Sequence, residues 1–147
     1  MKAKDRLDGM TVFFSHPPFT FRTSTERYCI SILDKLNVKK VINPIDYGLK
    51  DDMRALVRKS DAVIGMSVNS KLTFLVWNEM KYAEKHGKEI FTMMVESKDD
   101  IGPLIEGIPD NVKKLSLDES KIFTSEILSE HRETFFSLII GNWGRRF

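Results

Sequence analysis

Apolar residues in this chain fall into short continuous runs and into longer stretches where they recur every three or four positions. The continuous runs at residues 11–14, 41–43, 62–66 and 89–95 predict four β-strands. The last of these is apolar nearly throughout, which is typical of a strand covered on both faces. Residues 112–117 predict a fifth strand at a sheet edge, and residues 102–109, with two glycines and two prolines, predict a loop.

The periodic stretches predict four helices. Thr23 and Glu26 have the spacing of a capping box and begin the first, whose apolar positions are Cys29, Ile32, Leu33 and Leu36. The second follows two acidic residues that suit a first helical turn, and its buried face is Met53, Leu56 and Val57. The third covers residues 71–86 and ends at Gly87. Thr124 is predicted to cap the last helix, from residue 125 to about residue 140.

Strands that alternate with helices at this spacing predict a single α/β domain over residues 1–147. We expect a doubly wound, mostly parallel sheet of four to five strands, flavodoxin- or Rossmann-like, with helices on both faces and a C-terminal helix. Residues 141–147 follow that last helix as a tail.

Composition and charge exclude several functions. The chain has 23 Lys and Arg against 21 Asp and Glu, interspersed along its length, which argues against nucleic-acid binding. No apolar run approaches the roughly 20 residues of a membrane span. A single cysteine and a charged start without the apolar segment of a signal peptide predict a cytoplasmic protein. Neither a glycine-rich phosphate loop nor metal-ligand spacing of the three histidines is present, so we expect no cofactor and no metal.

Glu79 is the residue with the clearest chemical signal. In the third predicted helix it falls within an apolar stripe formed by Leu72, Leu75, Val76, Met80 and Ala83. Such a carboxylate would point at the carboxyl ends of the strands, where ligands bind in open α/β sheets. We therefore expect Glu79 to be partly buried, to face a pocket and to have a raised pKa. The alternative is a structural glutamate that pairs with an arginine or caps a backbone group.

Polar and aromatic residues follow the predicted strands at the same edge of the sheet. They are Ser15, His16 and Phe19 after the first strand, Asn43 after the second, and Ser67 and Asn69 after the third. Hydroxyls, amides, an aromatic face and a carboxylate together suit a nucleoside, in which the base stacks and the sugar accepts hydrogen bonds. Each residue also has a structural explanation, because Ser15 and Asn43 are turn formers and Phe19 is a core residue type.

The segments Ser60-Asp-Ala-Val-Ile-Gly-Met66, Glu79-Met-Lys-Tyr-Ala83 and Gly87-Lys-Glu-Ile-Phe91 resemble the nucleoside 2-deoxyribosyltransferases and their hydrolase relatives. The likeness extends over residues 11–95 and includes the first strand with its Pro/Phe loop. It implies an α/β fold and an enzyme that cleaves or transfers the N-glycosidic bond of a nucleoside or nucleotide. Glu79 would then be the nucleophile, and His16 or Asp52 would donate a proton to the leaving base. The family's sugar-binding Asp falls at Met53, next to Asp52.

The same stretch is also similar to Toll/interleukin-1 receptor (TIR)-like domains, through Arg58-Lys-Ser-Asp-Ala-Val-Ile64 and Trp77-Asn-Glu79. That likeness implies a domain that cleaves NAD with the same glutamate. A third hypothesis is a non-catalytic module that binds a nucleotide or forms oligomers. The bulky residues at 76–78 favour this hypothesis if they close the pocket.

Two features predict a homo-oligomer. Phe74 and Trp77 lie opposite the apolar stripe of their helix, where they would form an interface or be covered by the C-terminal helix. The tail ends in Trp143-Gly-Arg-Arg-Phe147, and Arg145 and Arg146 would suit a phosphate or sugar in a neighbouring subunit's site. Completion of a site by a neighbour's chain end is also what the resemblance to the deoxyribosyltransferases implies.

Overall fold

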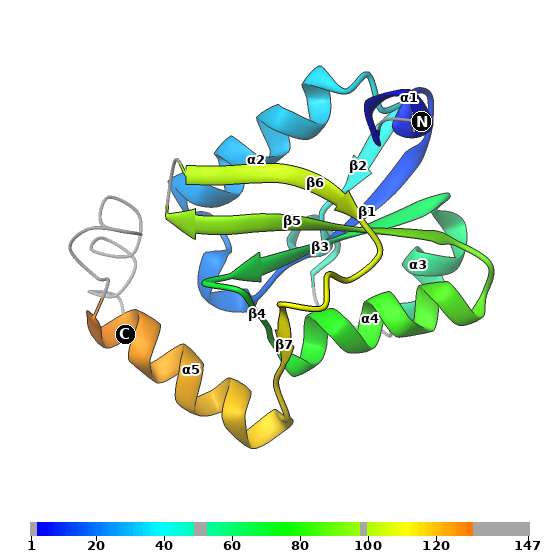
Figure 1. Ribbon diagram of the computed structural model, residues 1–147. Coiled ribbons are helices and arrows are strands. Elements are labelled where there is room, and N and C mark those ends of the chain that lie inside the picture. The colour runs from blue at the N-terminus through cyan, green and yellow to red at the C-terminus, as the bar shows by residue number, and fades with distance from the viewer. Residues whose placement is uncertain (1–2, 49–52, 98–99, 131–147) are drawn as a thin grey trace.

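A mixed β-sheet forms the centre of the computed structural model, which describes residues 3–48, 53–97 and 100–130 (Figure 1). Four neighbouring strands are parallel, in the order β2-β1-β3-β5. Strand β6 is antiparallel to β5, β4 is antiparallel to the end of β3, and β7 pairs with β4. The strands are β1 Thr11–Ser15, β2 Lys40–Ile42, β3 Ala62–Val68, β4 Lys71–Leu72, β5 Glu89–Ser97, β6 Asp100–Glu106 and β7 Lys113–Lys114.

Helices cover both faces of the sheet (Figure 1). One apolar cluster joins α1, α2 and α5 to residues such as Val12 and Phe14 of β1. The other joins α3 and α4 to Phe13 and Val63, because successive side chains of a strand point to opposite faces. The helices are α1 Ala3–Leu7, α2 Ser24–Lys35, α3 Arg54–Lys59, α4 Phe74–Lys85 and α5 Leu117–Glu130, with 3₁₀ turns η1 Pro18–Thr20 and η2 Pro44–Tyr47. The predicted α/β fold is confirmed, with its mostly parallel sheet and a C-terminal helix.

The Met80 side chain of helix α4 packs directly against Gly65 of the central strand. A Cβ atom added at Gly65 of β3 would lie 2.2 Å from Sδ of Met80, and Met80 is fully buried. The absence of a side chain at Gly65 therefore leaves the space that the Met80 side chain fills.

The predicted loop at residues 102–109 was wrong over most of its length. Residues 100–106 form β6, which pairs with β5 and carries half-buried Ile101, Leu104 and Ile105. Pro103 is compatible with this strand because, among the described strands, β6 pairs only with β5, and an edge position tolerates proline. Glycine and proline locally favour a loop, but residues 100–106 gain backbone pairing with β5, which precedes them in the chain.

Helix α5 begins at Leu117 rather than at residue 125, and the strand expected at 112–117 shrinks to Lys113–Lys114. A capping box explains the earlier start: Ser116 N–H donates to Oε1 of Glu119 at 2.9 Å, and Glu119 N–H donates to Oγ of Ser116 at 3.1 Å. Thr124 lies inside the helix, where its hydroxyl donates to the carbonyl of Ser120.

The helix predicted over residues 71–86 begins later, at Phe74. Leu72 is buried, but it belongs to β4, and Leu75 is exposed. Two residues with positive φ, Asn69 (51°) and Ser70 (60°), connect β3 to β4 as a two-residue hairpin loop. That backbone combination is typical of a type I′ turn, which reverses the chain before α4 starts.

No helix in the described part of the chain is long and apolar enough to cross a membrane.

Candidate functional site

The carboxylate of Glu79 lies half-buried where α4 passes the carboxyl end of β1. The hydroxyl of Ser15, the last residue of β1, donates a hydrogen bond of 2.6 Å to Oε1 of Glu79. Burial raises the pKa of Glu79 to about 7, because desolvation disfavours the charged form, and the hydrogen bond from Ser15 opposes that rise. A carboxyl group with this pKa exchanges its proton near neutral pH.

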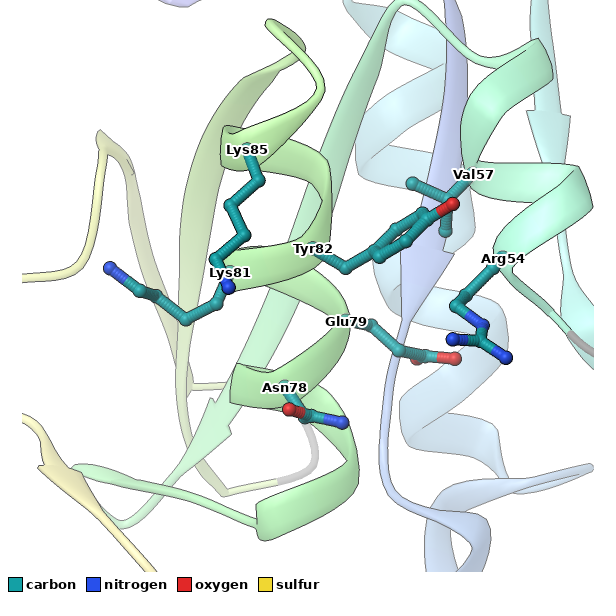
Figure 2. Close-up of a pocket in the computed structure, with 7 residues that line it drawn as sticks. All are labelled: Arg54, Val57, Asn78, Glu79, Lys81, Tyr82 and Lys85. Carbon is teal, nitrogen blue, oxygen red and sulfur yellow. The ribbon is translucent and has the colours of Figure 1, made fainter.

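Glu79 borders a pocket of about 230 Å³ between α3 and α4. Figure 2 shows Arg54 reaching from α3 toward the space into which Glu79 and Tyr82 point from α4. The guanidinium of Arg54 lies 5.9 Å from the centre of the Tyr82 ring, and Arg58 donates a 2.6 Å hydrogen bond to the Tyr82 hydroxyl. The two arginines therefore hold Tyr82 as one wall. The lining residues are Arg54, Val57, Asn78, Glu79, Lys81, Tyr82 and Lys85.

A second, larger pocket of about 410 Å³ lies between the amino end of α4, η1 and α5. Its volume falls within the range of small-molecule sites. The exposed side chains of Leu75 and Leu117 line it. Asn78 borders both pockets, so the two adjoin along the outer side of α4.

Of the residues predicted to bind substrate, the structure brings Ser15 to Glu79. His16, the next residue, engages the opposite side of the sheet. Its Nε2 lies 2.7 Å from Oε2 of Glu26 on α2, and its Nδ1 donates to the carbonyl of Phe14 at 2.8 Å. The ring also stacks on Phe14, with centroids 4.1 Å apart. With both nitrogens occupied and the ring buried, His16 does not line the Glu79 pocket and is not placed to protonate a base there.

Asn43 belongs to the same buried network as His16. Its side chain accepts a hydrogen bond from Ile45 N–H and also bonds Glu26. Burial by itself would raise the pKa of Glu26, but the bonds and charge from His16, the Arg22 N–H and Asn43 together lower it. Glu26 also departs from the predicted capping box. Its N–H bonds the Thr23 hydroxyl as expected, but its carboxylate accepts from Arg22 instead of Thr23.

The remaining predicted site residues have structural contacts or lie outside the described residues. Phe19 is buried and packs edge-on against Phe123 of α5, with ring centroids 6.0 Å apart. The Ser67 hydroxyl contacts Sδ of Met94 at 3.2 Å, and Asn69 forms the hairpin loop. Three of the predicted site residues lie outside the described residues: Asp52, Arg145 and Arg146.

The Glu79 pocket is also lined by four residues that were not predicted from the sequence: Arg54, Lys81, Tyr82 and Lys85. Tyr82 had a usable signal, because it follows Glu79 by three positions and therefore shares its side of the helix. Arg54 had none, since only the packing of α3 against α4 brings it to the pocket.

Phe74 and Trp77, predicted to form an interface or to be covered by the C-terminal helix, make contacts within the chain. The indole Nε1 of Trp77 donates to the carbonyl of Leu115 at 2.7 Å, and the two aromatic rings pack edge-on with centroids 5.4 Å apart. Phe74 N–H donates to the hydroxyl of Ser120 on α5. These contacts favour the alternative in which the C-terminal helix covers this face, and a homo-oligomer stays a prediction.

No protein-family model, curated protein or solved structure gives a significant match to this chain.

Proposed function

We propose that this protein cleaves the N-glycosidic bond of a nucleoside or nucleotide, with Glu79 as the nucleophile. The observation that carries the proposal is a half-buried carboxylate, held by Ser15 and bordering a pocket, whose pKa burial raises to about 7. Perturbed carboxylates in clefts are concentrated at functional sites. The resemblance to the deoxyribosyltransferases assigns the same glutamate.

In the proposed reaction the Glu79 carboxylate forms a bond to the anomeric carbon as the bond from that carbon to the base nitrogen breaks. The bonding electrons leave with the base, which takes a proton from solvent. Water, or a second base, then attacks the anomeric carbon and releases Glu79. Ser15 is a positioning residue, because its hydroxyl orients the Glu79 carboxylate.

Because only the ionised carboxylate attacks, we expect kcat/KM to rise with pH through about 7, the pKa of Glu79. The test is a panel of nucleosides, nucleoside monophosphates and NAD, with release of free base measured by chromatography. Glu79→Gln keeps the side-chain shape and removes the nucleophile, so it should reduce turnover at least about a hundredfold.

Glu126→Gln, an exposed substitution on α5, is the matched control and should retain full activity. Equal turnover by Glu79→Gln and wild type, or no base release from any member of the panel, contradicts the proposal. Nicotinamide release from NAD alone would instead support the TIR-like hypothesis.

A further inference from the structure

Tyr82 and Glu79 project from the same side of α4. Tyr82 follows Glu79 by three positions, a spacing that brings two side chains of a helix together. Both residues line the pocket between α3 and α4, and Figure 2 shows both side chains pointing into it. A molecule that occupies this space and reaches the Glu79 carboxylate therefore also lies beside the Tyr82 side chain.

The Tyr82 hydroxyl is held in place as a hydrogen-bond acceptor. Arg58 on α3 donates to it at 2.6 Å, and the guanidinium of Arg54 lies 5.9 Å from the centre of the Tyr82 ring. The ring of His86 also packs against Tyr82, with centroids 4.2 Å apart. A phenolic hydroxyl both accepts and donates, and no described residue accepts a hydrogen bond from this one. Its hydrogen is therefore available to a molecule in the pocket.

Cleavage of an N-glycosidic bond requires an acid as well as a nucleophile. The base nitrogen receives both bonding electrons when the bond breaks, and a natural base is a poor leaving group until it takes a proton. General acid catalysis contributes about a hundredfold to ten-thousandfold to the rate of such a step. Of the two proton donors predicted from the sequence, His16 faces α2 and Asp52 lies outside the described residues.

Tyr82 is the side chain on the described pocket wall that is suited to give up a proton beside the nucleophile. A guanidinium keeps its protons at any physiological pH, which excludes Arg54 as the acid. The Asn78 amide is not an acid, and Figure 2 shows Lys81 and Lys85 on the other side of α4 from the carboxylate. Tyrosine hydroxyls, in contrast, are among the groups that transfer protons in enzymes.

We propose that Tyr82 is the general acid that protonates the departing base. The assignment rests on the proposed function and names a second catalytic residue for it. As the bond from the anomeric carbon to the base nitrogen breaks, a ring nitrogen of the base takes the hydrogen of the Tyr82 hydroxyl as a proton. The electrons of that O–H bond stay on the Tyr82 oxygen, where the hydrogen bond from Arg58 stabilises the negative charge. Solvent then returns a proton to Tyr82, so the proton that the base carries away is replaced from solvent.

A pair of substrates distinguishes a proton donor from a residue that only binds or packs. The first is a nucleoside that the wild-type protein cleaves, and the second is the 4-nitrophenyl glycoside of the same sugar, whose nitrophenolate leaves without a proton. Tyr82→Phe keeps the ring and removes the hydroxyl. It should reduce kcat for the nucleoside at least about a hundredfold and kcat for the nitrophenyl glycoside less than about threefold.

Tyr28→Phe is the matched control, because Tyr28 is 46% exposed on α2 and does not line the pocket. It should leave both rates unchanged. The pH dependence gives a second readout, since an essential acid makes kcat/KM fall at alkaline pH. This fall should disappear in Tyr82→Phe and persist in Tyr28→Phe.

The outcomes separate this inference from the proposed function. A full nucleoside rate in Tyr82→Phe, or an equal loss for both substrates, overturns the assignment of Tyr82 and leaves Glu79 as the nucleophile. An unchanged alkaline fall of kcat/KM in Tyr82→Phe also overturns it. No base release by the wild type, or undiminished release by Glu79→Gln, contradicts the proposed function and this inference with it.

Discussion

Ser15 and Glu79 are 64 residues apart in the chain, and the hydrogen bond between them joins the end of β1 to the middle of α4. Both side chains are largely shielded from water. Burial of a carboxylate without a hydrogen-bond partner is costly. The Ser15 hydroxyl supplies that partner, and its hydrogen bond lowers a pKa that burial raises. Burial therefore dominates the pKa of Glu79, and the hydrogen bond from Ser15 opposes it.

Replacing Ser15 with alanine should raise the pKa of Glu79 above its present value of about 7, because the interaction that stabilises the ionised form is removed. A carbon-13 NMR titration of the Glu79 carboxyl measures this directly. Ser67→Ala is the control: Ser67 is buried on the neighbouring strand and contacts Met94 rather than Glu79. An unchanged or lower pKa in Ser15→Ala would show that the hydroxyl does not govern this titration.

At the scale of elements, α4 packs on the sheet through an apolar cluster in which Met80 fills the space above Gly65. Burial of Val76, Met80 and Ala83 turns one side of α4 toward β3, and Glu79 at the margin of that side is left half-buried. The apolar periodicity of the helix therefore places the Glu79 carboxylate at the edge of its buried side.

Gly65→Ala should destabilise the protein by roughly 1–3 kcal/mol, because the added methyl group meets the fully buried Met80 side chain. Urea denaturation measures the free energy of unfolding. In a Met80→Ala background the same substitution should cost little, since the space it needs has been vacated. Gly102→Ala, whose added Cβ would find its nearest neighbour at an ordinary 3.5 Å, is the matched control. Equal effects of Gly65→Ala in both backgrounds would contradict the packing argument.

At the scale of the whole molecule, the two faces of the sheet respond to pH in opposite directions. On the α2 face the pKa of Glu26 is lowered, so its contribution to stability is present at neutral pH and is lost as pH falls through its folded-state pKa. On the α4 face the pKa of Glu79 is raised above its ordinary value of 4.5. Between pH 4.5 and about 7, Glu79 keeps its proton in the folded protein but loses it in the unfolded chain. The free energy of unfolding therefore decreases as pH rises through this range.

Glu79→Gln should therefore become more stable relative to wild type as pH rises through that window, by at most roughly 3 kcal/mol at pH 8. The variant keeps an acceptor for Ser15 and carries no charge to desolvate. Thermal unfolding from pH 4 to pH 8 gives the difference at each pH. Glu84→Gln, an exposed position on the same helix, should show no comparable trend. A constant difference between Glu79→Gln and wild type would show that burial does not shift Glu79.

Hydrophobic patterning alone determined the class of this protein and most of its elements. Strands β1, β3 and β5 are continuous apolar runs, and α2 and α4 have helical periodicity, so their positions follow from local burial requirements. The same local signal singled out Glu79, because a carboxylate near an apolar stripe is a conflict visible in the sequence itself.

Only the tertiary structure decided which polar residues join Glu79. Ser15 and His16 are adjacent in sequence, yet one bonds α4 and the other α2, because neighbouring side chains at a strand end diverge to opposite faces. Arg54 reaches the pocket through helix–helix packing, and β6 forms through pairing with β5, despite its glycine and proline. These features depend on contacts between segments far apart in the chain, whereas periodicity and turn signals report only on neighbouring residues.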